Sequence, residues 1–316
     1  MAKYVARRLL GMVPTMLLLV LLVVLMFSML PGNIVDVLLQ DSGGDTSAAA
    51  RAEMEHSLGL DMPIPERYVR YVFGVVRGDL GASLWDGRPV AESIAARAPV
   101  TAQVAAIAIC VSILISIPLG VVSAVKRNSL IDYALRSMSI LGISLPSFVV
   151  ATAIVIVPAL LFQASLPFQY KSFAEDPIQN LQIVLPAAGV LGMLLSASIA
   201  RLMRTTMLDV LQQDYMRTAR AKGLTTLSIV VRHGLRNALI PVITLLGLQL
   251  AALIGGSVIT ESIFGLPGIG RLLLDSLSKR DYPVVQGIVV LVGMLIMLTN
   301  LAVDLSYGYL DPRVRH

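Results

Sequence analysis

The chain has 316 residues, of which 56% are hydrophobic and only 14% are charged, and its mean hydropathy is +0.79. Soluble domains are typically about 25% charged, so this composition excludes a soluble protein and predicts an all-α integral membrane protein. The formal net charge of +5 would suit nucleic acid or anionic lipid as a partner, but the charges divide unequally between the two sides of the membrane.

Cysteine and histidine are scarce. The single cysteine, Cys110, lies in an apolar run and has no partner for an intrachain disulfide. The three histidines, His56, His233 and His316, stand far apart in the sequence. The sequence therefore gives little support to cysteine chemistry or to a His/Cys metal site, and we expect this chain to bind no metal or other cofactor.

Six stretches are long and apolar enough to cross a membrane as helices. The first, at 22 residues, would be about 33 Å long, which matches a hydrocarbon core of about 30 Å. The fourth is the shortest, at 17 residues. The six stretches are residues 9–30, 100–125, 137–162, 184–200, 237–260 and 284–303.

The first stretch shares one feature with a signal peptide, because Lys3, Arg7 and Arg8 precede it. Its apolar run is longer than the roughly 7–15 residues of a signal peptide's apolar region. The sequence MLPGNIVD that follows offers no small-x-small cleavage site. We therefore expect this helix to be retained as the first span.

Positive charges indicate the orientation. With the N-terminus in the cytosol, the inner segments hold 15 of the 25 Lys and Arg residues. The outer segments hold 10, and 6 of these lie in one long loop that the positive-inside rule does not count. Acidic residues follow the opposite trend, with 5 inside and 15 outside. We expect a multi-pass protein of the cell (inner) membrane with both termini in the cytoplasm.

The long outer loop, residues 31–98, carries signals for two helices. Ser47 precedes AAARAEMEHSLGL, which Gly59 would end, and Pro65 opens PERYVRYVFGVVRGD. The second helix has an apolar stripe at helical spacing, formed by Ile64, Tyr68, Tyr71, Val72 and Val75. We expect the stripe to pack on the helix bundle or to lie in the membrane interface; the alternative is that the loop receives an extracellular partner.

The segment GDLGASLWDG, residues 78–87, holds the only tryptophan, Trp85, beside three glycines and two aspartates. This composition suits a tight turn that presents one aromatic ring. Two interpretations are open. Trp85 contacts a partner outside the membrane, or its indole anchors the loop at the lipid headgroups.

The stretch DYMRTARAKGL, residues 214–224, is crowded with charge and lies in the longest cytosolic loop. The pattern over residues 205–222 is helical, and Gly223 stands where a left-handed residue would end the helix. Thr225 or Thr226 can then cap a second helix that continues into the fifth span. The sequence predicts a helix, a glycine corner and a second helix at the inner face.

Three cations of this loop, Arg217, Arg220 and Lys222, are not accounted for by the neighbouring spans. They are more than ten residues from either neighbouring span, so simple anchoring of span ends at the headgroups, which is the alternative interpretation, does not explain them. We expect a cytosolic partner to contact them.

Energy for transport has no evident source in this chain. None of the five lysines follows a glycine, so the phosphate-binding motif G-x-x-x-x-G-K-[ST] is absent. The spans also lack acidic residues in their interiors, with Glu261 and Asp304 only at the edges. A proton or sodium relay therefore has no obvious groups, and we expect a non-catalytic chain that draws energy from a partner.

Two other classes of membrane protein are disfavoured. A stand-alone carrier or channel would need ionisable groups inside the spans or an internal repeat, and the sequence shows neither. An intramembrane protease would need a histidine or lysine to activate a serine, and no span contains either residue. Serines in spans more often serve helix packing; in this chain they are Ser112, Ser116, Ser139, Ser144, Ser196 and Ser198.

Four stretches together resemble the permease subunits of ABC importers. DYMRTARAKGLTTLSIVVRHGLRNALIPVIT resembles the cytosolic loop of that superfamily. Three others are similar to the first permease of the dipeptide and oligopeptide systems: RRLLGMVPTMLLLVLLVVLMFSMLPG, LGLDMPIPERYVRYVFGVVRGDLGASL and SVITESIFGLPGIGRLLLDSLSKRDYPVVQG. The likeness covers nearly the whole chain, and the GDLG and FGLPGIG–RDYPVVQG segments narrow it to the peptide and nickel branch.

The resemblance implies a type I importer fold with six transmembrane helices. It also implies partners, namely a second homologous permease that completes the pore, two ATPase subunits that bind ATP and Mg²⁺, and a substrate-binding protein outside the membrane. The cargo would be di- or oligopeptides, with nickel or glutathione as alternatives. Residues 1–98 would form the first helix and outer loop, and residues 99–316 a five-helix permease domain with a coupling loop at 204–236.

The resemblance further implies that the cytosolic loop docks on an ATPase. The family's motif begins Glu-Ala-Ala, with a glycine four residues after the second alanine, and this sequence has Arg217, Thr218, Ala219 and Gly223 at those positions. An arginine replaces the acid, so a salt bridge made by the family's glutamate does not carry over. The implied contact residues are Asp214, Tyr215, Arg217, Thr218, Ala219, Arg220, Lys222, Gly223 and Leu224.

Overall fold

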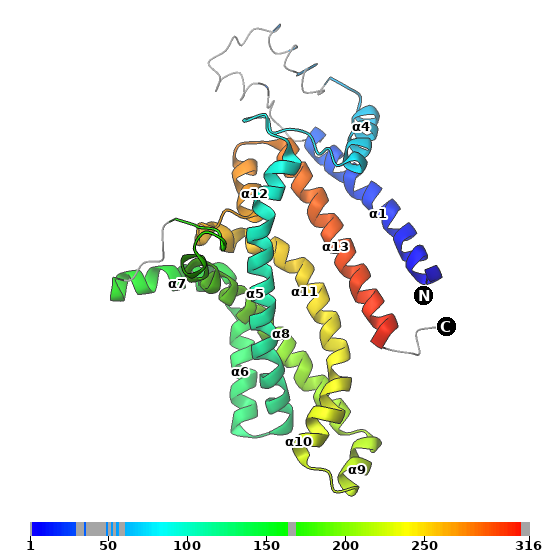
Figure 1. Cartoon of the computed structure of the whole chain (residues 1–316), viewed down its shortest axis with the longest axis vertical. Helices are drawn as coiled ribbons and strands as arrows, with labels where there is room; N and C mark the ends of the chain where they lie inside the picture. The colour runs from blue at the N-terminus through cyan, green and yellow to red at the C-terminus, as the bar shows by residue number, and fades with distance from the viewer. Residues whose placement is uncertain are drawn as a thin grey trace. The chain divides into compact units, whose positions relative to one another are not determined.

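The computed structural model describes residues 2–29, 61–163 and 169–310, with a few single positions between 30 and 60. Over these ranges the chain is almost entirely helical, and one isolated β-bridge joins Ala82 and Pro89 (Figure 1). Helices suit a bilayer because each one satisfies its own backbone hydrogen bonds where water is absent. The prediction of an all-α membrane protein is confirmed. The helix expected after Ser47 lies largely outside the described residues.

The described residues form helices of very different lengths, from 3 residues in α10 to 36 residues in α5. In chain order they are α1 (Ala2–Met29), α4 (Ile64–Arg77), α5 (Val90–Val125), α6 (Leu130–Ser144), α7 (Ser147–Phe162), α8 (Pro177–Leu211), α9 (Asp214–Ala221), α10 (Thr226–Ser228), the π-helix η1 (Ile229–Leu235), α11 (Arg236–Ile263), α12 (Ile269–Ser278) and α13 (Tyr282–Leu310).

Five helical segments among the described residues are long and apolar enough to cross a membrane. They contain or overlap the first, second, fourth, fifth and sixth predicted stretches. The five are Arg8–Met29, Val90–Val125, Pro177–Leu211, Thr226–Leu250 and Tyr282–Val303.

The third predicted stretch, residues 137–162, is not one straight helix. The chain bends by 94° between α6 and α7, which have 15 and 16 residues and are long enough to cross a membrane only together. Pro146 causes the break, because a proline disfavours helical backbone at the residue before it, and Leu145 has φ −84° and ψ 123°. A single uninterrupted third span was therefore a wrong prediction, and the described chain has five or six spans depending on how this pair is counted.

The fourth stretch, the shortest by sequence, becomes the 35-residue helix α8. The most apolar part of α8 is 61% buried, more than in any other candidate span of the described chain. Small residues let neighbouring helices approach closely. A Cβ on Gly192 would lie 2.7 Å from the Ala108 carbonyl oxygen of α5, and a Cβ on Gly120 of α5 would lie 2.6 Å from Cβ of Met203.

The chain groups into two compact units. One comprises Pro99–Arg271 and the residues from Leu298 onward, and the other comprises Ala2–Ala98 and Leu272–Met297. The predicted boundary between residues 98 and 99 coincides with one of the unit boundaries. The assignment of 1–98 and 99–316 to separate domains remains a prediction.

In the second unit, helix α4 packs against α1. Tyr68, Tyr71, Val72 and Val75 contact a cluster that contains Val20 and Val24 of α1 and Val290 of α13. The Tyr68 hydroxyl also donates to the Leu17 carbonyl oxygen at 3.2 Å. The prediction that the stripe packs on the bundle is confirmed for these four positions, whereas Ile64 is 39% exposed.

Candidate functional site: the loop from α8 to α11

Helix α9 is separate from α8. The pattern over residues 205–222 predicted one helix, but α8 ends at Leu211 and α9 begins at Asp214, with Gln213 between them in extended conformation (φ −67°, ψ 150°). The new direction lets α9 fold back and bury one face. Met216 and Ala219 of that face are 0% and 8% exposed and pack with Ile229 and Leu211.

Gly223 ends α9 as predicted. Its φ is +78°, in the left-handed region that residues with a Cβ rarely adopt. The Gly223 N–H donates to the Arg220 carbonyl at 2.9 Å, and the Leu224 N–H donates to the Ala219 carbonyl at 3.4 Å. These two bonds form a Schellman motif, which satisfies carbonyls that the helix end would leave unpaired. A Cβ at Gly223 would meet no atom within 4 Å, so the constraint at this position is conformational.

The second helix of the loop begins at Thr225, whose hydroxyl accepts from the Ser228 N–H at 3.4 Å. This confirms one of the two predicted caps. The helix then widens into the π-helix η1, which the sequence did not reveal; such turns are rare and frequently lie at functional sites. Gly234 of η1 packs so closely that a Cβ there would lie 2.5 Å from Cε of Met207 and 3.4 Å from Cε of Met216.

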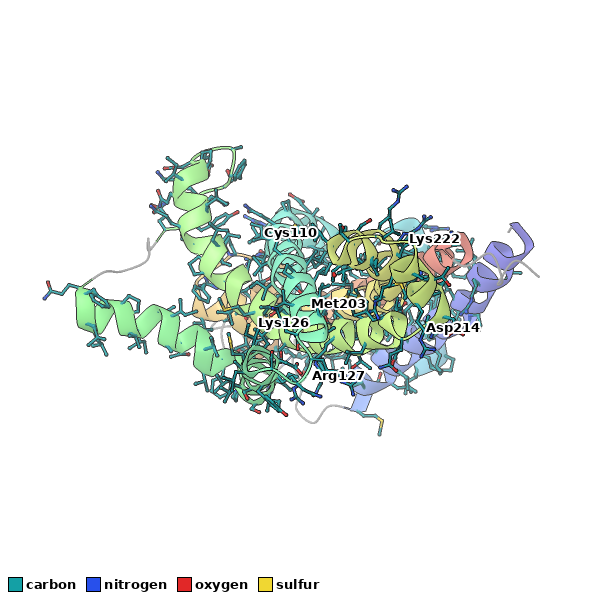
Figure 2. All side chains as sticks on the ribbon, turned by 90° about the horizontal axis from the view of Figure 1, so that it is seen from below. Cys110, Lys126, Arg127, Met203, Asp214 and Lys222 are labelled. Atoms are coloured by element: carbon teal, nitrogen blue, oxygen red, sulfur yellow. The ribbon has the colours of Figure 1, made fainter. Side chains whose placement is uncertain are left out.

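The outward face of the loop is cationic and partly apolar. Arg217 is 75% exposed, and its ion pair with Asp214 spans 3.5 Å between side chains that solvent surrounds, so it contributes little to stability. The other exposed residues of this face are Tyr215, Thr218, Arg220, Lys222, Gly223, Leu224, Leu227 and Val231. Asp214 and Lys222 are labelled in the view from below (Figure 2).

Two of the predicted contact residues have roles inside the chain. Ala219 faces inward against Ile229, so its side chain is not on the outward face. The Tyr215 hydroxyl accepts a hydrogen bond of 2.9 Å from the Asn237 amide of α11, which ties α9 to the start of the next long helix. The loop is therefore attached to α8 through Leu211 and to α11 through Asn237.

A buried ion pair connects three helices near the turn between α5 and α6. Arg204 of α8 donates through Nε and Nη2 to the two oxygens of Asp132 in α6, each at 2.8 Å. Ser123 of α5 donates to the same carboxylate at 2.5 Å, and the Asn128 N–H donates at 2.9 Å. Asp132 is 0% exposed. Sequence patterns missed this cluster because its charged members are 72 positions apart.

Glu261 lies near the end of α11, at the edge of the predicted fifth span, and is also fully buried. Thr101 donates to Glu261 Oε1 at 2.8 Å, and the Arg271 N–H of α12 donates to Oε2 at 3.1 Å. A Cβ on Gly268 would overlap the carboxylate. The FGLPGIG sequence thus wraps around Glu261, and the carboxylate satisfies the first turn of α12.

In the second unit, the GDLGASLW turn is bound to the segment before α13. Ser83 Oγ donates to Asp281 Oδ2 at 2.6 Å, and the Leu84 N–H donates to Oδ1 at 3.1 Å. The Trp85 indole Nε1–H donates to the Lys279 carbonyl at 2.9 Å. The two segments whose motifs resemble the peptide branch therefore contact each other.

Trp85 is half-buried and does not project freely from the turn. Next to it, the Arg88 N–H donates to Asp86 Oδ1 at 3.1 Å, and this bond holds the pKa of the Asp86 carboxyl below its ordinary value. Within the described ranges, no group of three His, Cys, Asp or Glu side chains is placed to hold a metal ion.

Several membrane-spanning helices with a cationic helix–glycine–helix loop define a polytopic membrane protein. Residues 116–316 match the family described as the binding-protein-dependent transport system inner membrane component. Residues 1–105 match the family described as the N-terminal part of that membrane component. The chain belongs to the family of binding-protein-dependent transport system inner membrane components.

Curated relatives agree along the full length. The dipeptide transport system permease protein DppB of Escherichia coli strain K12 is 37% identical over 340 aligned residues, which cover 100% of this chain and 99% of the relative. The glutathione transport system permease protein GsiC of Pectobacterium atrosepticum is 38% identical over 316 residues, with 100% of both chains covered. These relatives show that the chain is a permease of an ABC importer.

The fold is also found in a solved structure. A chain of the inward-facing methionine ABC transporter MetNI superposes with a TM-score of 0.54 at 18% sequence identity, and the match covers 69% of this chain and 96% of that one. At this identity the likeness concerns the fold alone, which is that of an ABC importer permease.

Proposed function

We propose that this chain forms half of the pore of an ATP-driven importer for di- or oligopeptides. A second homologous permease completes the pore, and two ATPase subunits bind ATP and Mg²⁺. A substrate-binding protein delivers cargo from outside. The chain itself contributes no catalytic residue and holds no cofactor; its task is to convert movement of the ATPases into rearrangement of the helices.

The exposed face of α9 carries this proposal. One face of α9 is buried through Met216 and Ala219, so the helix is held firmly, while its other face offers Arg217 and Lys222 to solvent. A firmly packed helix with exposed cations and a few apolar side chains has the composition of a docking surface. Because α9 is attached to α8 and α11, rigid-body movement of the docked partner would move both helices.

The placement of cations supports an orientation in which this loop faces the cytosol. Within the first unit, the turn between α5 and α6 lies at the same end as α9 and α10 (Figure 1). Lys126 and Arg127 of that turn and Lys222 of the loop are all exposed there (Figure 2). Clustering of basic residues at one end of a helix bundle is typical of its cytosolic side, and we infer that both termini are cytoplasmic.

Substitution of Gly223 by leucine tests the docking surface. Leucine at φ +78° strains the backbone by about 1–2 kcal/mol and places a bulky side chain on the exposed corner. We expect Gly223→Leu to insert into the membrane in normal amount but to lose co-purification of the ATPase subunits and peptide-stimulated ATP hydrolysis.

The matched control is Gly78→Leu. Gly78 ends α4 with φ +80°, and a Cβ there would also meet no atom within 4 Å. The two leucines thus impose the same backbone strain at a helix end, and the control should retain its ATPase subunits. The docking proposal fails if both variants retain them, and equal losses in both would assign the effect to strain in the fold.

The cargo is proposed from the relatives. The matched permeases are named for dipeptide and for glutathione transport, at 37% and 38% identity. Both cargos are short peptides with charged ends, so we propose a short peptide as the substrate. Competition of unlabelled dipeptide, glutathione and Ni²⁺ against uptake of a labelled dipeptide, in vesicles that contain the complete importer, ranks the three. Competition by Ni²⁺ alone would contradict the peptide assignment.

A further inference from the structure

A cavity of about 310 Å³ lies between α5, α6 and α8, beside the buried Asp132–Arg204 pair. Its walls belong entirely to the first unit and lie next to the turn between α5 and α6. The lining residues are Leu119, Ser123, Leu135, Arg136, Ser139, Ile140, Ala200, Arg201, Arg204 and Thr205. None of them belongs to the segment after α8, residues 212–235, whose outward face is proposed to dock the ATPase.

The cavity carries excess positive charge. Arg204 is neutralised by Asp132 through two hydrogen bonds. Arg136 reaches the same carboxylate only at 3.6 Å, and its Nε is buried without a hydrogen-bond acceptor. Arg201 is exposed and has no acidic partner in the part of the chain that the structure describes. The cavity walls thus hold three guanidinium groups, of which only Arg204 is fully paired, and Arg136 and Arg201 can donate to a further anion.

The remaining walls indicate what kind of anion would fit. The hydroxyls of Ser139 and Thr205 donate to backbone carbonyls of their own helices, at 2.9 Å and 3.1 Å, so the unused donors are guanidinium N–H groups. Leu119, Leu135 and Ile140 supply apolar surface beside them. An acceptor-rich anion with an attached hydrocarbon chain satisfies both parts of the cavity, whereas a small hydrated anion uses only the arginines.

We propose that this cavity binds the phosphate group of an anionic phospholipid, held by Arg136 and Arg201. Guanidinium groups suit phosphate because their N–H donors form paired, charge-assisted hydrogen bonds. Basic pockets between transmembrane helices near the cytosolic side are a recurring form of lipid headgroup recognition. The bound phosphate would give the buried Arg136 Nε an acceptor and would brace α6 against α8.

The test measures lipid binding to the intact chain. The full-length protein, purified with its partner subunits in zwitterionic detergent, is titrated with phosphatidylglycerol or with phosphatidylcholine of the same acyl chains, and bound lipid is counted by native mass spectrometry. We expect preferential binding of phosphatidylglycerol. Arg201→Gln should weaken that binding about fivefold. The Arg201 side chain is exposed and forms no hydrogen bond or ion pair within the described ranges, so we expect this variant to fold normally.

Arg127→Gln is the matched control. Arg127 is an exposed arginine of the α5–α6 turn and does not line the cavity, so its removal lowers the charge of the same end by the same amount. Binding should be unchanged in this variant. Equal weakening by Arg127→Gln and Arg201→Gln would mean general attraction to a basic surface and would overturn the proposal, as would unaltered binding in Arg201→Gln.

Competition with inorganic phosphate shows whether the ligand is a phospholipid or a free phosphate anion. We expect that millimolar phosphate fails to displace phosphatidylglycerol, because it cannot use the apolar walls. Full displacement by phosphate would overturn the lipid assignment and identify a site for a free phosphate anion. The result is independent of ATPase docking, since neither Arg136 nor Arg201 lies on the outward face of the loop.

Discussion

Helices α4 and α9 end in the same way, but the polar side chains near the two ends differ in whether they are bonded within the protein or exposed to solvent. Helix α4 ends at Gly78, which has φ +80°, and the Asp79 N–H donates to the Gly74 carbonyl at 2.9 Å. Helix α9 ends at Gly223, which has φ +78°, and the Leu224 N–H donates to the Ala219 carbonyl. After α4, the side chains that follow are bonded within the unit, above all to Asp281. On and after α9, most polar side chains remain in solvent.

This difference indicates which of the two helix ends is the better surface for docking a partner. A turn whose donors already have acceptors gains little from a new contact, because binding must first break existing hydrogen bonds. Exposed guanidinium and ammonium groups on a firmly packed helix break few existing hydrogen bonds when a partner docks, and the helix already holds them in position to contact it. We therefore place the input of mechanical energy at the α9 loop.

The largest effect should come from removal of ATP. If the inner loop is the mechanical link, peptide uptake into vesicles that contain the complete importer should stop entirely when ATP is withheld. Uptake should persist when a protonophore collapses the proton gradient, because a proton-driven carrier needs a group whose charge changes during the cycle. Uptake that follows the gradient and ignores ATP would replace the importer with a stand-alone carrier.

Glu261 is the control residue for that experiment. It is a buried carboxylate and therefore a candidate group for a proton relay, but Thr101 and the Arg271 N–H donate to its oxygens. The Glu261→Gln variant keeps an amide oxygen that can accept one of these hydrogen bonds. ATP-driven uptake should therefore survive in part and remain insensitive to the protonophore.

The second effect concerns the stability of the outer turn. Asp281 is 5% exposed and accepts from Ser83 and Leu84. The Asp281→Ala variant would leave both donors unpaired, at a cost of about 2–3 kcal/mol, so the turn should open more often. Trypsin should then cleave after Lys279 about 30- to 150-fold faster, since cleavage follows the population of the open form.

The corresponding change in the inner loop is Asp214→Ala. Asp214 is 96% exposed and pairs only with Arg217 at 3.5 Å. Exposed pairs of this kind contribute little, so we expect no resolvable change in trypsin cleavage at Arg217 or Arg220. An equally large acceleration in both variants would remove the contrast between the two regions.

Features encoded by neighbouring residues could be predicted from the sequence. The apolar runs indicated the membrane class and most spans, the glycine after a helical pattern marked the end of α9, and the stripe from Tyr68 to Val75 predicted packing on the bundle. Pro146 was a local signal for the bend, but the apolar run across it masked the break.

Features that depend on distant residues could not be predicted in this way. Asp132 and Arg204 look like ordinary inner-loop charges, and only the fold brings them within 2.8 Å. In the sequence Glu261 is an acid at the edge of a span, and only the fold packs Gly268 and Gly270 against its carboxylate. The break before α9 and the π-helix after it accompany the close packing of Gly234 against Met207 and Met216, a tertiary contact that local helix propensity does not report.

The smallest effect concerns Trp85, which we propose as a contact for the extracytoplasmic binding protein. Its indole N–H donates to the Lys279 carbonyl at 2.9 Å, and the side chain is half-buried. Trp85→Ala removes the ring and the hydrogen bond and should weaken docking of the purified binding protein about fivefold, the equivalent of one hydrogen bond of about 1 kcal/mol. Permease abundance should not change.

The Trp85→Phe variant tests the contribution of the aromatic ring independently of the indole hydrogen bond. Phenylalanine keeps an aromatic face but has no N–H for Lys279, so near-normal docking in this variant would assign recognition to the ring. Weakening equal to that of Trp85→Ala would show that Trp85 acts by holding the turn against the segment before α13. Unchanged affinity in both variants would contradict a docking role and would leave headgroup anchoring as the explanation of the indole.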